Sequence, residues 1–299
     1  MMCRWCDLAI IVPLHSRSNQ PGANPCTRRA IDTLLTFWYR IYGVLGVHWL
    51  WHTAAAIVVE QKEVIMRAQP FTVPVEYAGT SVRVDFIRRT YQHLAWAVLG
   101  FIVVEALLLQ WSGAQVLVRT MTGGYSWFIV LAAFMGVSWL AEKWAHSEAS
   151  PQMQYAGLAL FVVAEAIIFL PLLYIAAYFS SPNVIPTAGI VTALLFGGLT
   201  YIAFTTRRDF SFLGNILSLG GFVALGVIVA SMLFGFSLGV VFAGLMVAYA
   251  GGAILYNTSN IMHQYRPDQH VAAALALFAS VALMFWYVLQ TVMSLSDND

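Results

Sequence analysis

Long apolar stretches follow one another along the chain from about residue 93 onward. Seven of them lie at approximately 94–111, 126–144, 153–179, 186–206, 211–234, 236–257 and 270–293. About twenty mostly apolar residues in a helix cross a bilayer core of roughly 30 Å. The stretches are continuously apolar rather than alternating, which favours helices over the strands of a barrel. The pattern predicts an all-α, polytopic transmembrane bundle with seven spans joined by short loops.

The N-terminal part of the chain is harder to interpret. Residues 41–59 are apolar and long enough for an eighth span, or they form a helix lying in the membrane interface. Alternatively, Met66 is the natural start, and residues 66–92 are a short polar segment leading into the first helix. We therefore divide the chain into an N-terminal extension, residues 1–82, and a seven-helix membrane domain, residues 83–299.

Basic residues gather on one side of the predicted spans. That side carries Arg83, Arg88, Arg89, Lys143, Arg207, Arg208 and Arg266, whereas the other side carries only Arg119. Lys and Arg are enriched in the cytoplasmic loops of membrane proteins. The distribution predicts that the amino terminus of the bundle faces the cytoplasm. An eighth span at 41–59 would leave five further arginines on the outer side, against this rule.

Composition narrows the class of protein further. Hydrophobic residues make up 60% of the chain and charged residues only 10%, and the formal net charge is +1. Soluble domains carry about 25% charged residues, and nucleic-acid-binding proteins usually present a basic face. The expected environment is therefore the lipid bilayer, with no nucleic-acid partner.

Two acids fall deep inside predicted spans. Glu105 lies in the first span and Glu165 in the third, and both helices would run outward from the cytoplasm. Ionisable groups in a membrane are costly, so each is a candidate for function. If the two were neighbours, one would hold a proton at neutral pH, which would form a proton-sensitive gate or a cation site. The alternative is that each is protonated and bonded to an adjacent helix. Pro171, which follows Glu165 in the same helix, is expected to bend it.

Histidines and cysteines provide weaker candidates. His48 and His52 stand four residues apart, a spacing that can hold a metal or haem, but neighbouring tryptophans favour an interfacial aromatic belt. The CxxC pair at Cys3 and Cys6 has no second pair to complete a zinc site, so we expect no metal. His263 and His270 flank the last loop and could titrate near neutral pH.

Catalytic signatures are absent from the sequence. It contains no GxSxG, no HExxH and no glycine-rich phosphate loop followed by lysine. We therefore expect neither an enzyme nor a bound cofactor.

Three elements of the sequence resemble those of the Bax inhibitor-1/YccA family. They are TTRRDFSFLG at 205–214, ILYNTSNIMH at 254–263 and FIRRTY at 86–91. They occur in the family's order on seven spans, and residues 1–65 have no counterpart. The resemblance implies a seven-helix fold with a cytoplasmic amino terminus, in a bacterial inner membrane.

The resemblance also implies a function. Members are described as pH-sensitive calcium leaks, and the YccA branch restrains the membrane protease FtsH. The leak depends on two aspartates; the first matches Asn257 here and the second falls near Ser280, so that pair cannot ionise. Glu165 matches a frequent acid of the third helix.

The hypotheses are therefore a pH-modulated cation leak, with calcium as a possible permeant ion, or regulation of an FtsH-like protease. In the hypothesis of protease regulation, Arg207, Arg208 and Asp209 would form the cytoplasmic loop that takes part in the regulation. A cofactor-bearing or structural subunit of a membrane complex is the alternative.

Overall fold

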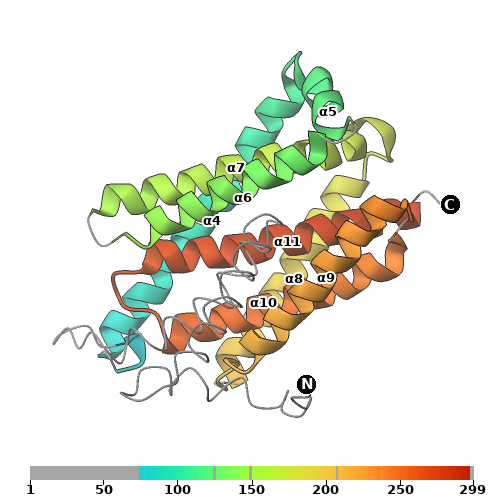
Figure 1. The fold of residues 1–299 in the computed structure, drawn as a ribbon. Helices are drawn as coiled ribbons and strands as arrows, with labels where there is room; N and C mark the ends of the chain where they lie inside the picture. Colours follow the sequence, from blue (N-terminus) through green and yellow to red (C-terminus); the bar gives the residue numbers. More distant parts are fainter. Residues whose placement is uncertain are drawn as a thin grey trace, which may run out of the picture. The chain divides into compact units, whose positions relative to one another are not determined.

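The computed structural model describes residues 74–77, 79–123, 126–147, 150–206, 208–236 and 238–296. These parts contain helices and no strands (Figure 1). The elements are η1 Val75–Tyr77, α4 Thr80–Gln110, α5 Ala114–Thr122, α6 Ser126–Ala145, α7 Pro151–Phe179, α8 Val184–Thr206, α9 Leu213–Phe234, α10 Gly239–His263 and α11 His270–Ser296. The predictions for the segment 41–59, for Met66 and for the histidine and cysteine pairs before it lie outside the described residues.

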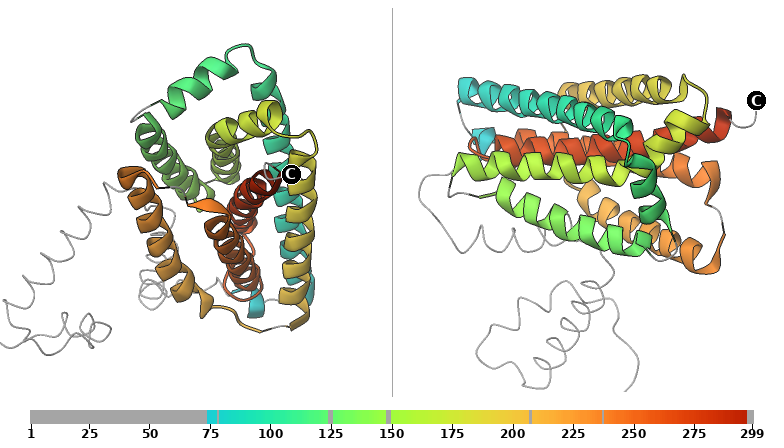
Figure 2. Two further views of the ribbon diagram at one scale, coloured as in Figure 1. Left: turned by 90° about the vertical axis from the view of Figure 1, so that its right-hand side faces the viewer. Right: turned by 90° about the horizontal axis from the view of Figure 1, so that it is seen from above.

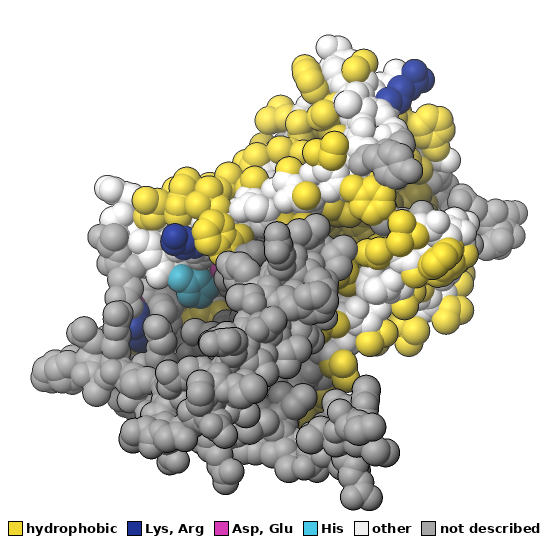
Figure 3. Space-filling model, in the orientation of Figure 1, with side chains coloured by type: hydrophobic (Ala, Val, Ile, Leu, Met, Phe, Trp, Pro, Cys, Tyr) yellow, Lys and Arg dark blue, Asp and Glu magenta, His cyan; other side chains and the backbone are white. Residues whose placement is uncertain are grey.

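Seven of the described helices are long and apolar enough to cross a membrane. They are α4 and α6 to α11, and only the nine-residue α5 is too short. Apolar side chains cover much of the described surface in Figure 3, as lipid contact requires. Of the exposed apolar side chains, Trp96, Leu107 and Val241 are each more than 60% exposed. The predicted seven-span, all-α fold is confirmed.

The first half of α4 and the preceding η1 meet the start of α7 and the loop after α10 at one end of the bundle. The ring of His93 on α4 stacks on Tyr155 near the start of α7, with centroids 5.3 Å apart. The backbone N–H of Val75 in η1 donates to the carbonyl of Tyr265 after α10, at 3.0 Å. This end also carries most of the basic residues, and we call it the basic end: Arg83, Arg88, Arg89, Lys143, Arg208 and Arg266.

The opposite end holds the other helix termini. The Tyr178 hydroxyl near the end of α7 donates to the carbonyl of Leu109 at the end of α4, at 3.1 Å. The Ser181 and Ser296 hydroxyls, after α7 and at the end of α11, are 3.1 Å apart. Helices α4, α7 and α11 therefore run in the same direction, each beginning at the basic end.

Helix α11 forms the centre of the bundle. It packs against α4, α7, α8 and α10, whereas α9 contacts mainly α10 (Figure 2). Most residues of the apolar parts of α7 and α11 are buried, in contrast to the more lipid-exposed α4, α6, α8 and α9. A polar side chain on α7 or α11 therefore has mostly protein around it.

Two helical segments were not expected from the sequence. Residues 80–92, predicted to be a polar lead, belong to α4, because Phe86 and Thr90 are buried against the bundle while polar residues face outward. Arg89 and Asp85 support this segment with an i,i+4 ion pair at 2.9 Å. The second segment, α5, buries one side through Ala114, Val118 and Met121. It is too short to give the long apolar signal that marked the spans.

Candidate functional site

Asn257 and Ser280 meet in the interior of the bundle, on the neighbouring helices α10 and α11. The Asn257 side-chain amide donates to the Ser280 hydroxyl at 2.7 Å and to the carbonyl of Ala276 at 3.3 Å. The Ser280 hydroxyl in turn donates to the Ala276 carbonyl at 3.0 Å. Ser280 is fully buried and Asn257 is 8% exposed. The contact is thus a neutral, well-satisfied hydrogen-bond unit that cannot gain or lose a proton near neutral pH.

The two intramembrane acids flank one aromatic contact between α4 and α7, on opposite sides of it. Glu105 follows Phe101 by one turn on α4, and Glu165 precedes Phe169 by one turn on α7. The rings of Phe101 and Phe169 are in contact, with centroids 5.1 Å apart. Since α4 and α7 run in the same direction, the acids are separated by about two helical turns, or roughly 11 Å, along the bundle axis and are not neighbours.

Glu105 has no hydrogen-bond partner in the described structure. Its side chain is 4% exposed, and both carboxyl oxygens are buried without a donor. Glu165, which is 8% exposed, therefore does not hydrogen-bond to Glu105. An ionised carboxylate is costly to bury unless it is paired. Glu105 is thus a position at which a proton or a cation would relieve a large desolvation penalty.

Helix α7 continues through Pro171, six residues beyond Glu165. Proline has no N–H, so the carbonyl of Ile167 lacks its usual helical partner. This leaves a weaker point in the backbone of α7 between Glu165 and the opposite end of the bundle.

At the basic end, the loop between α8 and α9 is fastened to the end of α10. Asp209 accepts hydrogen bonds from the backbone N–H and hydroxyl of Ser211, at 2.9 and 3.0 Å. The N–H of Phe210 donates to the Ser259 hydroxyl at 3.0 Å. Arg208 and Asp209 remain exposed. Arg207 lies outside the described residues, so the structure places two of the three predicted loop residues.

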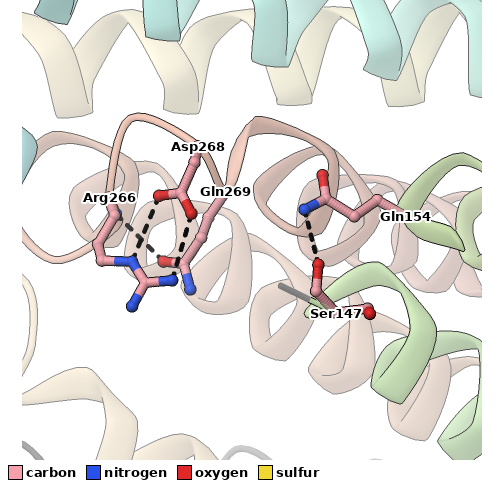
Figure 4. A network of polar contacts seen from close by, with 5 residues as sticks. All are labelled: Ser147, Gln154, Arg266, Asp268 and Gln269. Atoms are coloured by element: carbon pink, nitrogen blue, oxygen red, sulfur yellow. Dashed lines mark hydrogen bonds and ion pairs between the residues drawn. The ribbon is translucent and has the colours of Figure 1, made fainter. Parts of the chain in front are cut away.

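The loop between α10 and α11 is braced by its own charges. Arg266 binds both carboxyl oxygens of Asp268, at 3.2 and 3.3 Å, and its backbone N–H donates to Gln269 (Figure 4). A second bond at this end joins the Gln154 side chain of α7 to the carbonyl of Ser147, at 2.9 Å. The loops at the basic end are thus held in place by short local hydrogen bonds.

The two histidines that flank this loop in the sequence have different partners. His263 donates from Nδ1 to the carbonyl of Ser259 in its own helix, at 2.9 Å. His270 lies instead against His93 of α4, with ring centroids 5.0 Å apart. Nothing in the spacing of the sequence pointed to His93 as its neighbour.

A further polar cluster, also absent from the sequence interpretation, joins three helices. The hydroxyls of Thr200 on α8 and Thr258 on α10 face that of Tyr91 on α4. None of the three forms a hydrogen bond of good geometry in the described structure. All three residues are neutral near pH 7, so the cluster adds polarity to the bundle without adding charge. In the part of the chain that the structure describes, no three metal-ligating side chains come together.

Comparisons with known proteins agree with this architecture. The family model described as "Inhibitor of apoptosis-promoting Bax1" matches residues 83–297. Bax inhibitor 1 of Schizosaccharomyces pombe is 27% identical, over 76% of this chain and 83% of that protein. Lifeguard 4 of Mus musculus is 27% identical, over 71% of this chain and 86% of that protein. An uncharacterized protein of Pseudomonas aeruginosa is 30% identical, over 54% of this chain and 72% of that protein. With seven spans and a match across them all, the chain belongs to the Bax inhibitor-1 family of membrane proteins.

Proposed function

We propose that this protein is a pH-modulated cation leak, without enzymatic activity, in which Glu165 and Glu105 supply the titrating groups. The observation that carries the proposal is the burial of Glu105 with both carboxyl oxygens unpaired. A buried acid of this kind is stabilised either by a proton or by a cation, and the two compete. Calcium is the permeant ion to test first, since carboxylates are its preferred protein ligands.

The neutral pair on α10 and α11 supports assigning the pH dependence to the glutamates. Of the two aspartates on which the resemblance bases the leak, one matches Asn257 and the other falls near Ser280. Their amide and hydroxyl are hydrogen-bonded at 2.7 Å and carry no charge to exchange. The pH dependence of the leak must therefore come from other titrating groups. The two glutamates on α4 and α7, which lie inside the bundle, are the groups that we assign to it.

We also propose that the protein lies in a bacterial inner membrane with its basic end in the cytoplasm. The basic residues on that side outnumber the single Arg119 on the other. Such an excess of Lys and Arg favours cytoplasmic placement. The matches in Pseudomonas aeruginosa and Neisseria meningitidis support a bacterial setting.

Calcium flux in proteoliposomes tests the leak. We expect the wild-type protein to conduct more at one end of the range pH 6–8 than at the other, and Glu165→Gln to flatten that dependence. Glu105→Gln should flatten it in part. The matched control is Glu76→Gln, which makes the same chemical change at an exposed residue of η1. Flux in Glu165→Gln that follows the wild-type pH profile would refute the role of Glu165.

Regulation of an FtsH-like membrane protease is the second candidate. It is favoured by the loop between α8 and α9, where an exposed Arg208 stands beside backbone that hydrogen bonds of Asp209 and Ser259 hold. A partner protein could recognise this exposed, charged loop without any ionisable pair in the membrane. Co-purification from native detergent tests it. We expect association that is lost when Arg208 and Asp209 are both replaced by alanine, and no association with the wild-type protein would exclude it.

A cofactor-bearing or structural subunit of a membrane complex remains the alternative, and it depends on His48 and His52 outside the described residues. A Soret band in the absorbance spectrum of the purified protein would favour it over a leak.

A further inference from the structure

Two histidines from distant parts of the sequence face each other at the basic end. His93 lies on α4 and His270 begins α11, and their ring centroids are 5.0 Å apart. Both side chains are partly exposed, so protons from the aqueous phase can reach them. Tyr155 of α7 stacks on the other side of His93, at 5.3 Å. The pair therefore lies where the fourth turn of α4 meets the beginnings of α7 and α11.

The ring of His93 is held by its own helix. Nδ1 of His93 lies 2.6 Å from the carbonyl oxygen of Arg89 and must donate to it, so this bond does not use Nε2. A second proton on this ring adds a positive charge without breaking the bond.

The charges around the pair are otherwise nearly balanced. On α4, Arg89 is paired with Asp85 at 2.9 Å. In the loop before α11, both oxygens of Asp268 are bound to Arg266. Tyr155, from α7, is neutral near pH 7. When both imidazoles gain a proton, two positive charges lie about 5 Å apart, and the two carboxylates described above, Asp85 and Asp268, are already paired with arginines.

We propose that His93 and His270 form an acid-sensitive switch that loosens the contact between α4 and the start of α11. Histidine is the side chain that ordinarily changes charge between pH 5 and 8. The two rings pack against each other between α4, α7 and α11. Positive charge added to both rings by acid repels across this contact and weakens it. The switch acts on the conformation of the basic end whether or not the bundle conducts ions.

A double-mutant cycle on the full-length protein in nanodiscs tests the switch. Thermal midpoints of the wild type, His93→Gln, His270→Gln and the double variant are compared at pH 8 and pH 5.5. At pH 5.5 each single variant should melt higher than the wild type, and the double variant should gain little more. At pH 8 this unfavourable coupling should vanish. A coupling of equal sign and size at both pH values would overturn the proposal.

The cycle separates this pair from every other titrating group in the chain, including the acids in the membrane. His146→Gln is the matched control, because His146 is an exposed histidine at the end of α6 that also bonds a carbonyl four residues earlier. It should leave the difference between pH 8 and pH 5.5 unchanged.

Hydrogen exchange tests the switch in the wild-type protein alone, so the result does not depend on whether a variant folds. Residues 271–275 at the start of α11 are all buried, with exposures of 0–4%. After correction for intrinsic rates, acid should increase exchange in this segment of the wild type more than in the end of α11. Equal protection of residues 271–275 at pH 8 and pH 5.5 would refute the switch, whatever the flux through the bundle.

Discussion

Asn257 and Glu105 show two opposite ways of placing a polar residue in the membrane. The side-chain amide nitrogen of Asn257 donates to Ser280 and to Ala276, and these hydrogen bonds compensate for its burial. Glu105 is equally buried, but neither of its oxygens has a partner. The hydrogen bonds of Asn257 explain its burial by their contribution to stability. Glu105 has no such explanation, and function can justify the free-energy cost of burying an unpaired polar group.

Replacing Glu105 by methionine should therefore stabilise the protein. Methionine keeps a similar length and removes the unpaired polar group, for an expected gain of about 1–3 kcal/mol in the free energy of unfolding. Thermal unfolding in detergent measures the change. Glu105→Gln is the control, since it keeps unpaired polar atoms at the same place and should gain less. A clear loss of stability in Glu105→Met would show that the carboxyl group has a stabilising partner.

Close approach of two helices is the property that matters at the scale of the element. A Cβ atom on Gly157 of α7 would lie 2.5 Å from the carbonyl oxygen of Ala141 and 2.6 Å from the N–H nitrogen of Ala145, both in the backbone of α6. Small residues permit such contacts between membrane helices. The hairpin of α6 and α7, which carries Glu165, thus depends on a single glycine near its loop.

Gly157→Ala should force α6 and α7 apart and destabilise the protein by about 1–3 kcal/mol, because the backbone atoms it meets cannot move aside easily. Thermal unfolding in detergent measures this loss. Gly136→Ala is the matched control within α6, since nothing lies within 4 Å of a Cβ added there. It should be neutral or slightly stabilising. Equal effects of the two substitutions would contradict the close packing.

Orientation in the membrane is a property of the whole molecule. Exposed residues are available for labelling at both ends: Arg208 at the basic end, and Thr120 on α5 at the opposite end. After replacement of Cys3, Cys6 and Cys26 by serine, one new cysteine at a time can report on one side of the membrane.

We expect Thr120→Cys to react with a membrane-impermeant maleimide in bacterial cells whose outer membrane has been permeabilised. Arg208→Cys should react only after the inner membrane is broken, since the positive-inside rule places the basic end in the cytoplasm. The reverse pattern would mean that the molecule is inverted, and labelling of both sites in intact cells would argue against a spanning bundle.

Much of this architecture followed from the sequence. The seven spans were predicted because lipid requires each helix to satisfy its own backbone, so a long apolar run is itself the signal. Amphipathic segments gave no such signal, and for that reason the first turns of α4 and the whole of α5 were missed. The positions of Asn257 and Ser280 were identified from the resemblance, but their 2.7 Å hydrogen bond was not.

The sequence by itself thus determined the class of the protein, the number of spans and the burial of two acids. The tertiary structure decided which side chains meet. In the folded bundle, His270 contacts His93 rather than His263. Asn257 has a hydrogen-bond partner, whereas Glu105 has none. The physical reason is that hydropathy depends on a local window of residues. A contact between helices depends on their rotation and crossing, which the packing of the whole bundle sets.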